Sequence, residues 1–113
     1  MVIVMPKPDI RFHVWVGAFQ YSIQFVADLK KRYGEADKDK LLIRITKKCA
    51  EPIQRSTALH EIIHAYIHAH NHDLKEVTKE EKFVRIAEGL FHILADPRNT
   101  EFTQWVIHGT SEG

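Results

Sequence analysis

The sequence predicts an α+β fold in which a small, mostly antiparallel sheet is followed by helices. The first half of the chain alternates apolar and polar residues with the period of two that is typical of half-buried strands. From residue 52 onward, apolar residues recur with the helical period instead. A chain of 113 residues suits one compact domain and is too short for two, so residues 1–113 are expected to form a single domain.

Two hairpins are expected in the first half. Apolar and polar residues alternate over residues 10–16 and again over 19–25, on either side of a short turn that contains Gly17. Two such runs around a glycine-containing turn are typical of a hairpin. A second, shorter hairpin is predicted to start at residues 33–36 and to return over residues 41–46.

The first predicted helix begins at Pro52 and ends at the polar residues 71–73. Proline suits a first helical turn because its missing N–H would have no partner there. A last, short helix is predicted from about residue 100 to residue 108, ending at Gly109, which is a natural C-terminal cap.

A second helix is predicted between these two, with its start at a capping box and its end before Pro97. Thr78 can cap the first turn while the side chain of Glu81 reaches back to the N–H of Thr78. Asp73 and Glu76 form a rival capping pair that would start this helix a turn earlier. The two tryptophans and the phenylalanines are expected in the core of the domain.

Composition excludes several classes of protein. The 16 basic and 15 acidic residues give a net charge of +1, whereas a nucleic-acid-binding protein would need a clustered basic excess. Cys49 is the single cysteine, so no intramolecular disulfide is possible and a reducing compartment fits best. The apolar residues 1–5 are too few for a signal peptide or a membrane span. We therefore expect a cytoplasmic protein that binds neither nucleic acid nor membrane.

The pattern with the most specific chemistry is His60-Glu61-Ile62-Ile63-His64, on the first predicted helix. Two histidines four residues apart project from one face of a helix, so both imidazoles can bind one metal ion, by default zinc. Glu61, the next residue round the helix, can accept a proton from a water molecule that the metal activates. The pattern predicts one zinc ion per chain with Glu61 as general base.

Two histidine ligands leave the metal short of a third protein ligand. His70 has the spacing of the longer metzincin motif, but Ile67 stands where that motif needs a glycine to turn the chain. His68 continues the row of His60 and His64, whose ends lie roughly 12 Å apart at 1.5 Å rise per residue, too far for one ion. Both His68 and His70 are therefore expected to be surface residues.

The second predicted helix is the better source, because it offers Glu80, Glu81 and Glu88. Glu81 already has a capping role, whereas Glu80 shares the apolar stripe of Phe83 and Ala87, which is predicted to pack inward. A carboxylate on such a stripe needs a partner, and a metal would supply one. Glu80 is therefore the favoured third ligand, with Glu81 and Glu88 as alternatives.

The residues around the histidine pair, Thr57–Ala65, followed by Glu80-Glu81 and then Arg85–Asp96, resemble small single-domain zinc metallopeptidases carried by phages and prophages. The likeness covers roughly residues 10–107 and departs at Asp96-Pro97, where Asp-Asn is usual. The chain is also similar to minimal gluzincins. That resemblance implies a zincin-like sheet, an active-site helix with the HExxH motif, and a glutamate helix. It further implies His60, His64 and Glu80 as metal ligands, Glu61 as general base, and the host cytoplasm as location.

The function expected from these residues is hydrolysis of peptide bonds in a peptide or protein substrate. An extended substrate could pair with an edge strand at residues 41–46. His92, His108 and Tyr66 are open alternatives for the residue that stabilises the tetrahedral intermediate. The alternative function is a non-catalytic, zinc-stabilised binding module, such as a viral effector domain, which would need no general base at position 61.

Overall fold

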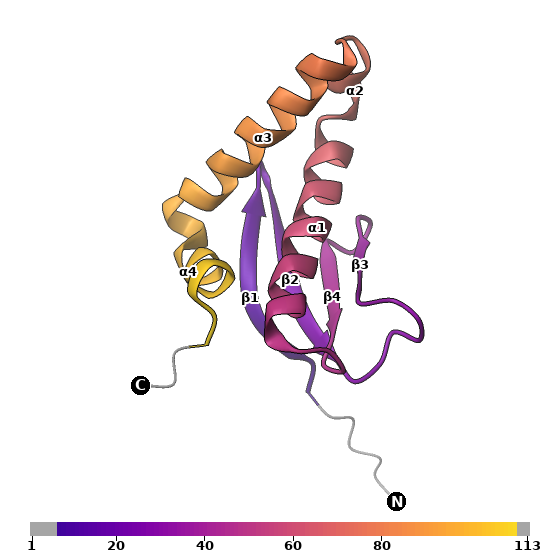
Figure 1. Cartoon of the computed structure of the whole chain (residues 1–113), viewed down its shortest axis with the longest axis vertical. Coiled ribbons are helices and arrows are strands. Elements are labelled where there is room, and N and C mark those ends of the chain that lie inside the picture. Colours follow the sequence, from indigo (N-terminus) through magenta and orange to yellow (C-terminus); the bar gives the residue numbers. More distant parts are fainter. Residues whose placement is uncertain (1–6, 111–113) are drawn as a thin grey trace, which may run out of the picture.

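The strands of the protein precede its helices, as the sequence predicts, in a computed structural model that describes residues 7–110 (Figure 1). The chain order is β1 (Asp9–Val16), β2 (Phe19–Val26), β3 (Gly34–Asp37), β4 (Leu42–Thr46), α1 (Glu51–Ala69), α2 (Asn71–Lys75), α3 (Lys79–Ala95), the 3-10 turn η1 (Pro97–Asn99) and α4 (Thr100–His108). The apolar run at residues 1–5 lies outside the described residues. None of the helices between residues 7 and 110 is both long and apolar enough to span a membrane.

The four strands form a mixed sheet in the order β1-β2-β4-β3. Both predicted hairpins are confirmed, because β1 pairs with β2 and β3 pairs with β4, each antiparallel. The hairpins are joined by a parallel pairing of β2 with β4, which the alternation of residues does not reveal. The prediction that residues 41–46 form an edge strand is wrong, because β4 lies inside the sheet and β3 forms that edge.

The opposite edge of the sheet is β1, whose ladder with β2 is irregular. The register shifts between Ile10 and Phe12. Beside this irregularity, Asp9 forms ion pairs with Arg11 at 2.9 Å and with Lys47 at 3.0 Å. Hydrogen bonds from the guanidinium of Arg11 and then from the ammonium of Lys47 lower the pKa of Asp9 to about 2.

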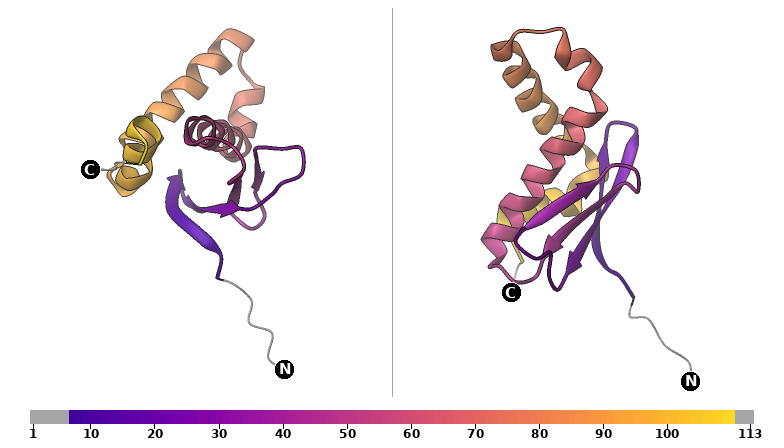
Figure 2. Two further views of the ribbon diagram at one scale, coloured as in Figure 1. Left: turned by 60° about the horizontal axis from the view of Figure 1, so that its bottom comes forward. Right: turned by 90° about the vertical axis from the view of Figure 1, so that its right-hand side faces the viewer.

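One face of the sheet is apolar and lies under α1 (Figure 2). Its buried side chains come from β1, β2 and β4, and they are Val14, Val16, Tyr21, Ile23, Phe25, Ile43 and Ile45. On α1 the fully buried residues are Ala58, Ile62 and Ala65, which share one side of the helix. The two apolar surfaces form one core, which α4 extends with Phe102, Trp105 and Val106.

The start of α3 agrees with the predicted capping box in part. The side chain of Thr78 accepts a hydrogen bond from the N–H of Glu81 at 3.2 Å, and the helix begins at Lys79, so the rival start at Asp73 is not used. The carboxylate of Glu81 pairs with Arg85 at 3.0 Å. The polar residues 71–73 do end α1, but the chain then forms the short helix α2.

The packing of α3 differs from the prediction. It contacts α1 through Gly89, where a Cβ would overlap the ring of Tyr66, so only glycine permits this approach. The predicted inward stripe is divided: Ile93 is buried and Ile86, Leu90 and Leu94 are half-buried, whereas Phe83 is 76% exposed and Ala87 and Glu80 are exposed as well. The prediction that the phenylalanines belong to the core is therefore wrong for Phe83, as it is for Phe91 and Phe19.

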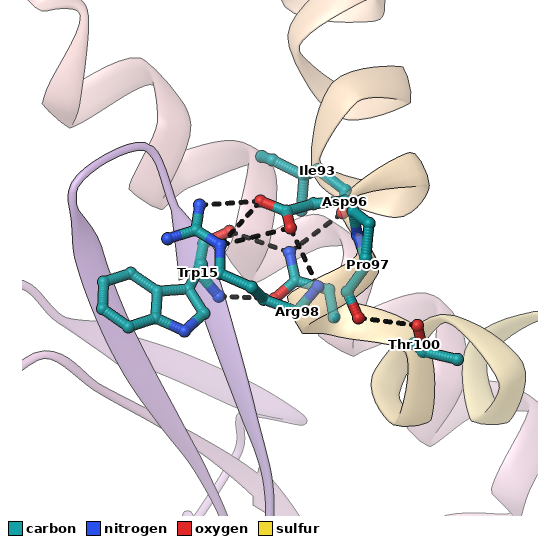
Figure 3. A network of polar contacts seen from close by, with 7 residues as sticks. Trp15, Ile93, Asp96, Pro97, Arg98 and Thr100 are labelled. Atoms are coloured by element: carbon teal, nitrogen blue, oxygen red, sulfur yellow. Dashed lines mark hydrogen bonds and ion pairs between the residues drawn. The ribbon is translucent and has the colours of Figure 1, made fainter.

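The end of α3 is fixed to β1 by a polar network (Figure 3). Asn99 is 1% exposed; its side chain accepts a hydrogen bond from the N–H of Trp15 and donates to the carbonyls of Trp15 and Ile93 at 2.7–2.9 Å. Asp96 caps η1 and pairs with Arg98, whose guanidinium lies 4.4 Å from the centre of the Trp15 ring. The network orients α3 and α4 relative to the sheet.

Replacing Asn99 with Leu should destabilise the protein by about 2–4 kcal/mol, because it leaves the backbone groups of Trp15 and Ile93 without partners. Urea denaturation followed by circular dichroism measures the change in the free energy of unfolding. Gln104→Leu is the matched control, since Gln104 is exposed on α4 and should change stability by less than about 0.5 kcal/mol. Equal effects of the two variants would contradict the structural role of Asn99.

Candidate metal centre

His60, Glu61 and His64 converge on one side of α1. The histidines are separated by about 40° around the helix, and both are exposed to solvent. Their Nε2 atoms lie 3.0 Å apart. Within residues 7–110 these three residues form a group whose possible ligand atoms all lie within 4.8 Å of one another. The helix places the predicted motif as the spacing of its residues requires.

The two imidazoles fit a zinc ion in the distance between their donor atoms. Two nitrogen ligands about 2.0–2.1 Å from a tetrahedral zinc lie about 3.3 Å apart. The observed 3.0 Å between the Nε2 atoms of His60 and His64 needs only a small adjustment of either ring. The carboxylate that accompanies them is that of Glu61.

Glu61 is held in place by the close approach of β3 to α1. It is 6% exposed, in contrast to the exposed histidines. A Cβ on Gly34 would lie 2.5 Å from Cγ2 of Thr57, 3.2 Å from the carbonyl oxygen of Arg44 and 3.4 Å from Cγ of Glu61. Gly34 therefore allows the edge strand to lie directly against the helix face that carries Glu61.

A groove of about 530 Å³ opens beside His60 and Glu61. One wall comes from α1, and the other from the segment that leads into β3. Its lining residues are Arg32, Tyr33, Gly34, Ser56, Thr57, His60 and Glu61. Glu61 therefore lines an open groove although little of its surface is exposed.

The structure does not bring Glu80 to the histidines. Glu80, Glu81 and Glu88 are exposed on α3, and none belongs to the converging group. The contact between α3 and α1 at Tyr66 lies about 160° around α1 from His64, and Glu80 lies about 13 Å further along α3 from Gly89. The first turn of α3 therefore extends past the end of α1 (Figure 1).

His68 and His70, which follow His64 in the sequence and were not expected to bind the metal, lie apart from the His60–His64 pair. His68 is exposed on the next turn of α1, and His70 stacks on Tyr66 at 4.3 Å between ring centres. The side chain of His72 is outside the described part of the chain. Neither His68 nor His70 belongs to the converging group; His68 is a surface residue as predicted, whereas His70 is half-buried.

The three residues suggested for stabilising a tetrahedral intermediate do not line the groove. The hydroxyl of Tyr66 donates to the carbonyl of Arg85 at 3.3 Å, on the side of α1 that faces α3. His92 borders a separate cavity of about 380 Å³ between α3 and the β1–β2 turn, and His108 ends α4. Arg32 and Tyr33, for which the sequence predicts no role in the site, line the groove instead.

Comparisons with known protein families, with curated proteins and with solved structures found no match.

Gly34→Ala should destabilise the protein by about 1–3 kcal/mol, because the added methyl group forces β3 away from α1. Thr57→Ser removes the methyl group nearest to that Cβ and should cost less on its own. In the double variant the loss of stability should be smaller than the sum of the two single losses, as measured by urea denaturation. Simple additivity would contradict a direct contact between β3 and α1 at this point.

Replacing either His60 or His64 with Ala should reduce bound zinc to a small fraction of the parent value, because one imidazole holds zinc poorly. The measurement is metal analysis of protein purified without a histidine tag and without added metal. Variants with Gln at His68 or His70 are the controls, and they should retain about one zinc per chain. Full zinc occupancy in both alanine variants would rule out this centre.

Proposed function

We propose that the protein is a zinc-dependent metallopeptidase in which His60 and His64 bind the metal and Glu61 is the general base. The observation that carries this proposal is the convergence of the three side chains beside a groove, with the histidines exposed and the glutamate buried. A zinc ion held there would polarise a peptide carbonyl and lower the pKa of water towards roughly 7.

Glu61 is suited to accept and return a proton. Within residues 7–110 no lysine or arginine forms an ion pair with it, so its carboxylate is available to the groove. A base in this position accepts the proton of the attacking water and returns it to the leaving amine. The close packing of Gly34 against Thr57 and Glu61 on α1 restricts the side chain of Glu61 to few conformations, which favours proton transfer.

The substrate we propose is an extended peptide segment that pairs with the free edge of β3. This strand borders α1 and begins at Gly34, which also lines the groove. Backbone hydrogen bonds to an edge strand bind a peptide with little regard to its sequence. Among residues 7–110 the guanidinium of Arg32 forms an ion pair with Glu35 alone, at 3.7 Å, so it is able to donate a hydrogen bond to a substrate carbonyl.

The identity of the third protein ligand of the metal distinguishes the peptidase from a second candidate function. For the enzyme we propose Glu80, which requires α3 to move from its contact at Tyr66 to the side of α1 that carries the histidines, because in the described conformation Glu80 lies outside the group. The second candidate is a zinc-binding interaction module without catalysis. The observation in its favour is that Glu61 is the carboxylate that accompanies the histidines, and as a third ligand it would no longer serve as a base.

The effects of Glu61→Gln and Glu80→Gln on zinc binding should be exchanged between the peptidase and the interaction module. For the peptidase, Glu61→Gln keeps zinc and lowers cleavage at least on the order of a hundredfold, because the amide accepts no proton. Glu80→Gln then weakens zinc affinity by at least on the order of a hundredfold. Zinc titration with a competing chelator measures affinity, and an unbiased peptide library read by mass spectrometry measures cleavage.

For the interaction module the pattern is reversed: Glu61→Gln loses zinc, Glu80→Gln retains it, and the zinc-loaded parent cleaves nothing in the library. Glu88→Gln is the matched control, since Glu88 lies on the same helix, and it should leave both readouts unchanged. A parent that cleaves peptides as fast after Glu61→Gln would contradict the assignment of Glu61 as the base.

A further inference from the structure

The outer face of α3 carries an apolar stripe that the described part of the chain leaves uncovered. The stripe consists of Phe83, Val84, Ala87 and Phe91, and we call it the α3 stripe. Phe83 is 76% exposed, Phe91 67% and Val84 47%. Residues at this spacing lie on one side of a helix, and in a soluble protein such a side is normally packed.

The exposed area of the α3 stripe is larger than isolated surface residues explain. Its two aromatic rings and one valine together leave roughly 350 Å² of apolar surface in water, a patch size that often marks an interaction site. Leu90 and Leu94 are half-buried beside it and extend the apolar surface toward α4. None of the stripe residues lines the groove at His60 and Glu61, so this surface is distinct from the candidate metal centre.

The residues of the stripe are spaced so that two copies of it can pack against each other in antiparallel orientation. Phe83 precedes Ala87 by four residues and Phe91 follows it by four. A twofold axis through Ala87 therefore places each Phe83 against the Phe91 of an antiparallel second helix, as an interface between identical surfaces requires. The small side chain of Ala87 at the axis lets the two helices approach to the usual 8–10 Å.

We propose that the α3 stripe is the interface of a homodimer in which two α3 helices pack antiparallel about a twofold axis at Ala87. Two stripes together remove roughly 700 Å² of apolar surface from water. The helices are about 25 Å long, and the polar side chains that flank each stripe add to the buried surface. The total buried area then reaches about 1,000 Å², which is the lower limit for a specific interface. An interface at this lower limit is typical of a weak, reversible dimer.

Sedimentation equilibrium of the full chain between about 1 and 200 µM should show a mass that rises from monomer to dimer. Phe91→Lys should keep the chain monomeric over the whole range, because it buries two charges in the interface. Phe19→Lys is the matched control, since Phe19 is also an exposed phenylalanine, at 50%, but lies at the β1–β2 turn. A parent protein that stays monomeric at the highest concentration would overturn the proposal, as would a control as dissociated as Phe91→Lys.

Disulfide trapping tests the geometry. In a Cys49→Ser background, Ala87→Cys should form a cross-linked dimer on mild oxidation, because two Cα atoms at the axis lie about 4–5.5 Å apart. Lys79→Cys should stay uncrosslinked, since antiparallel packing separates its two copies by about 24 Å along the helices. Efficient cross-linking of Lys79→Cys would indicate parallel packing, and failure of Ala87→Cys would exclude an axis at this residue. Either result would overturn the proposed dimer.

Discussion

The packing of α1 on the apolar face of the sheet determines the rest of the arrangement. Burying Ala58, Ile62 and Ala65 fixes the rotation of the helix about its own axis. Because each residue turns the helix by about 100°, that rotation directs the His60–His64 pair to solvent and Glu61 towards β3. The core and the candidate metal centre therefore depend on one contact, and any change that rotated α1 would disturb both.

Local patterns in the sequence predicted the elements and the two hairpins, but not how the hairpins pair with each other or how α3 packs. The alternation in β1 and β2 and the capping pattern at Thr78 identify strands and a helix start because each depends on nearby residues. The parallel pairing of β2 with β4 joins segments that have no sequence signal for each other, so β4 was wrongly placed at an edge. For α3, the apolar stripe predicted that the helix packs but not on which side its partner lies, and the chain uses Gly89 and Tyr66 instead.

In the candidate site, too, the features set by local spacing were predictable and those set by tertiary packing were not. The grouping of His60, Glu61 and His64 follows from helical spacing alone, so it was predictable. The groove depends on Gly34, which meets Thr57 and Glu61 only after the sheet has formed, and its one sequence signal is a glycine at the start of a strand. The position of Glu80 relative to α1 is set by how two helices pack, and nothing in the spacing of α3 encodes that angle. Asn99 was missed because its three partners are distant backbone groups.

The irregular edge at β1 has a consequence for how the protein behaves at high concentration. An exposed edge strand is a template on which another chain can add a strand and begin aggregation, and a broken ladder with charged side chains is a common protection. Here the register shift between Ile10 and Phe12 interrupts the template, and Asp9 and Arg11 place charges beside it. Because the pKa of Asp9 is about 2, its carboxylate stays ionised well into acid. The ion pairs of Asp9 with Arg11 and Lys47 beside this edge thus persist at acidic pH values at which an ordinary aspartate would be largely neutral.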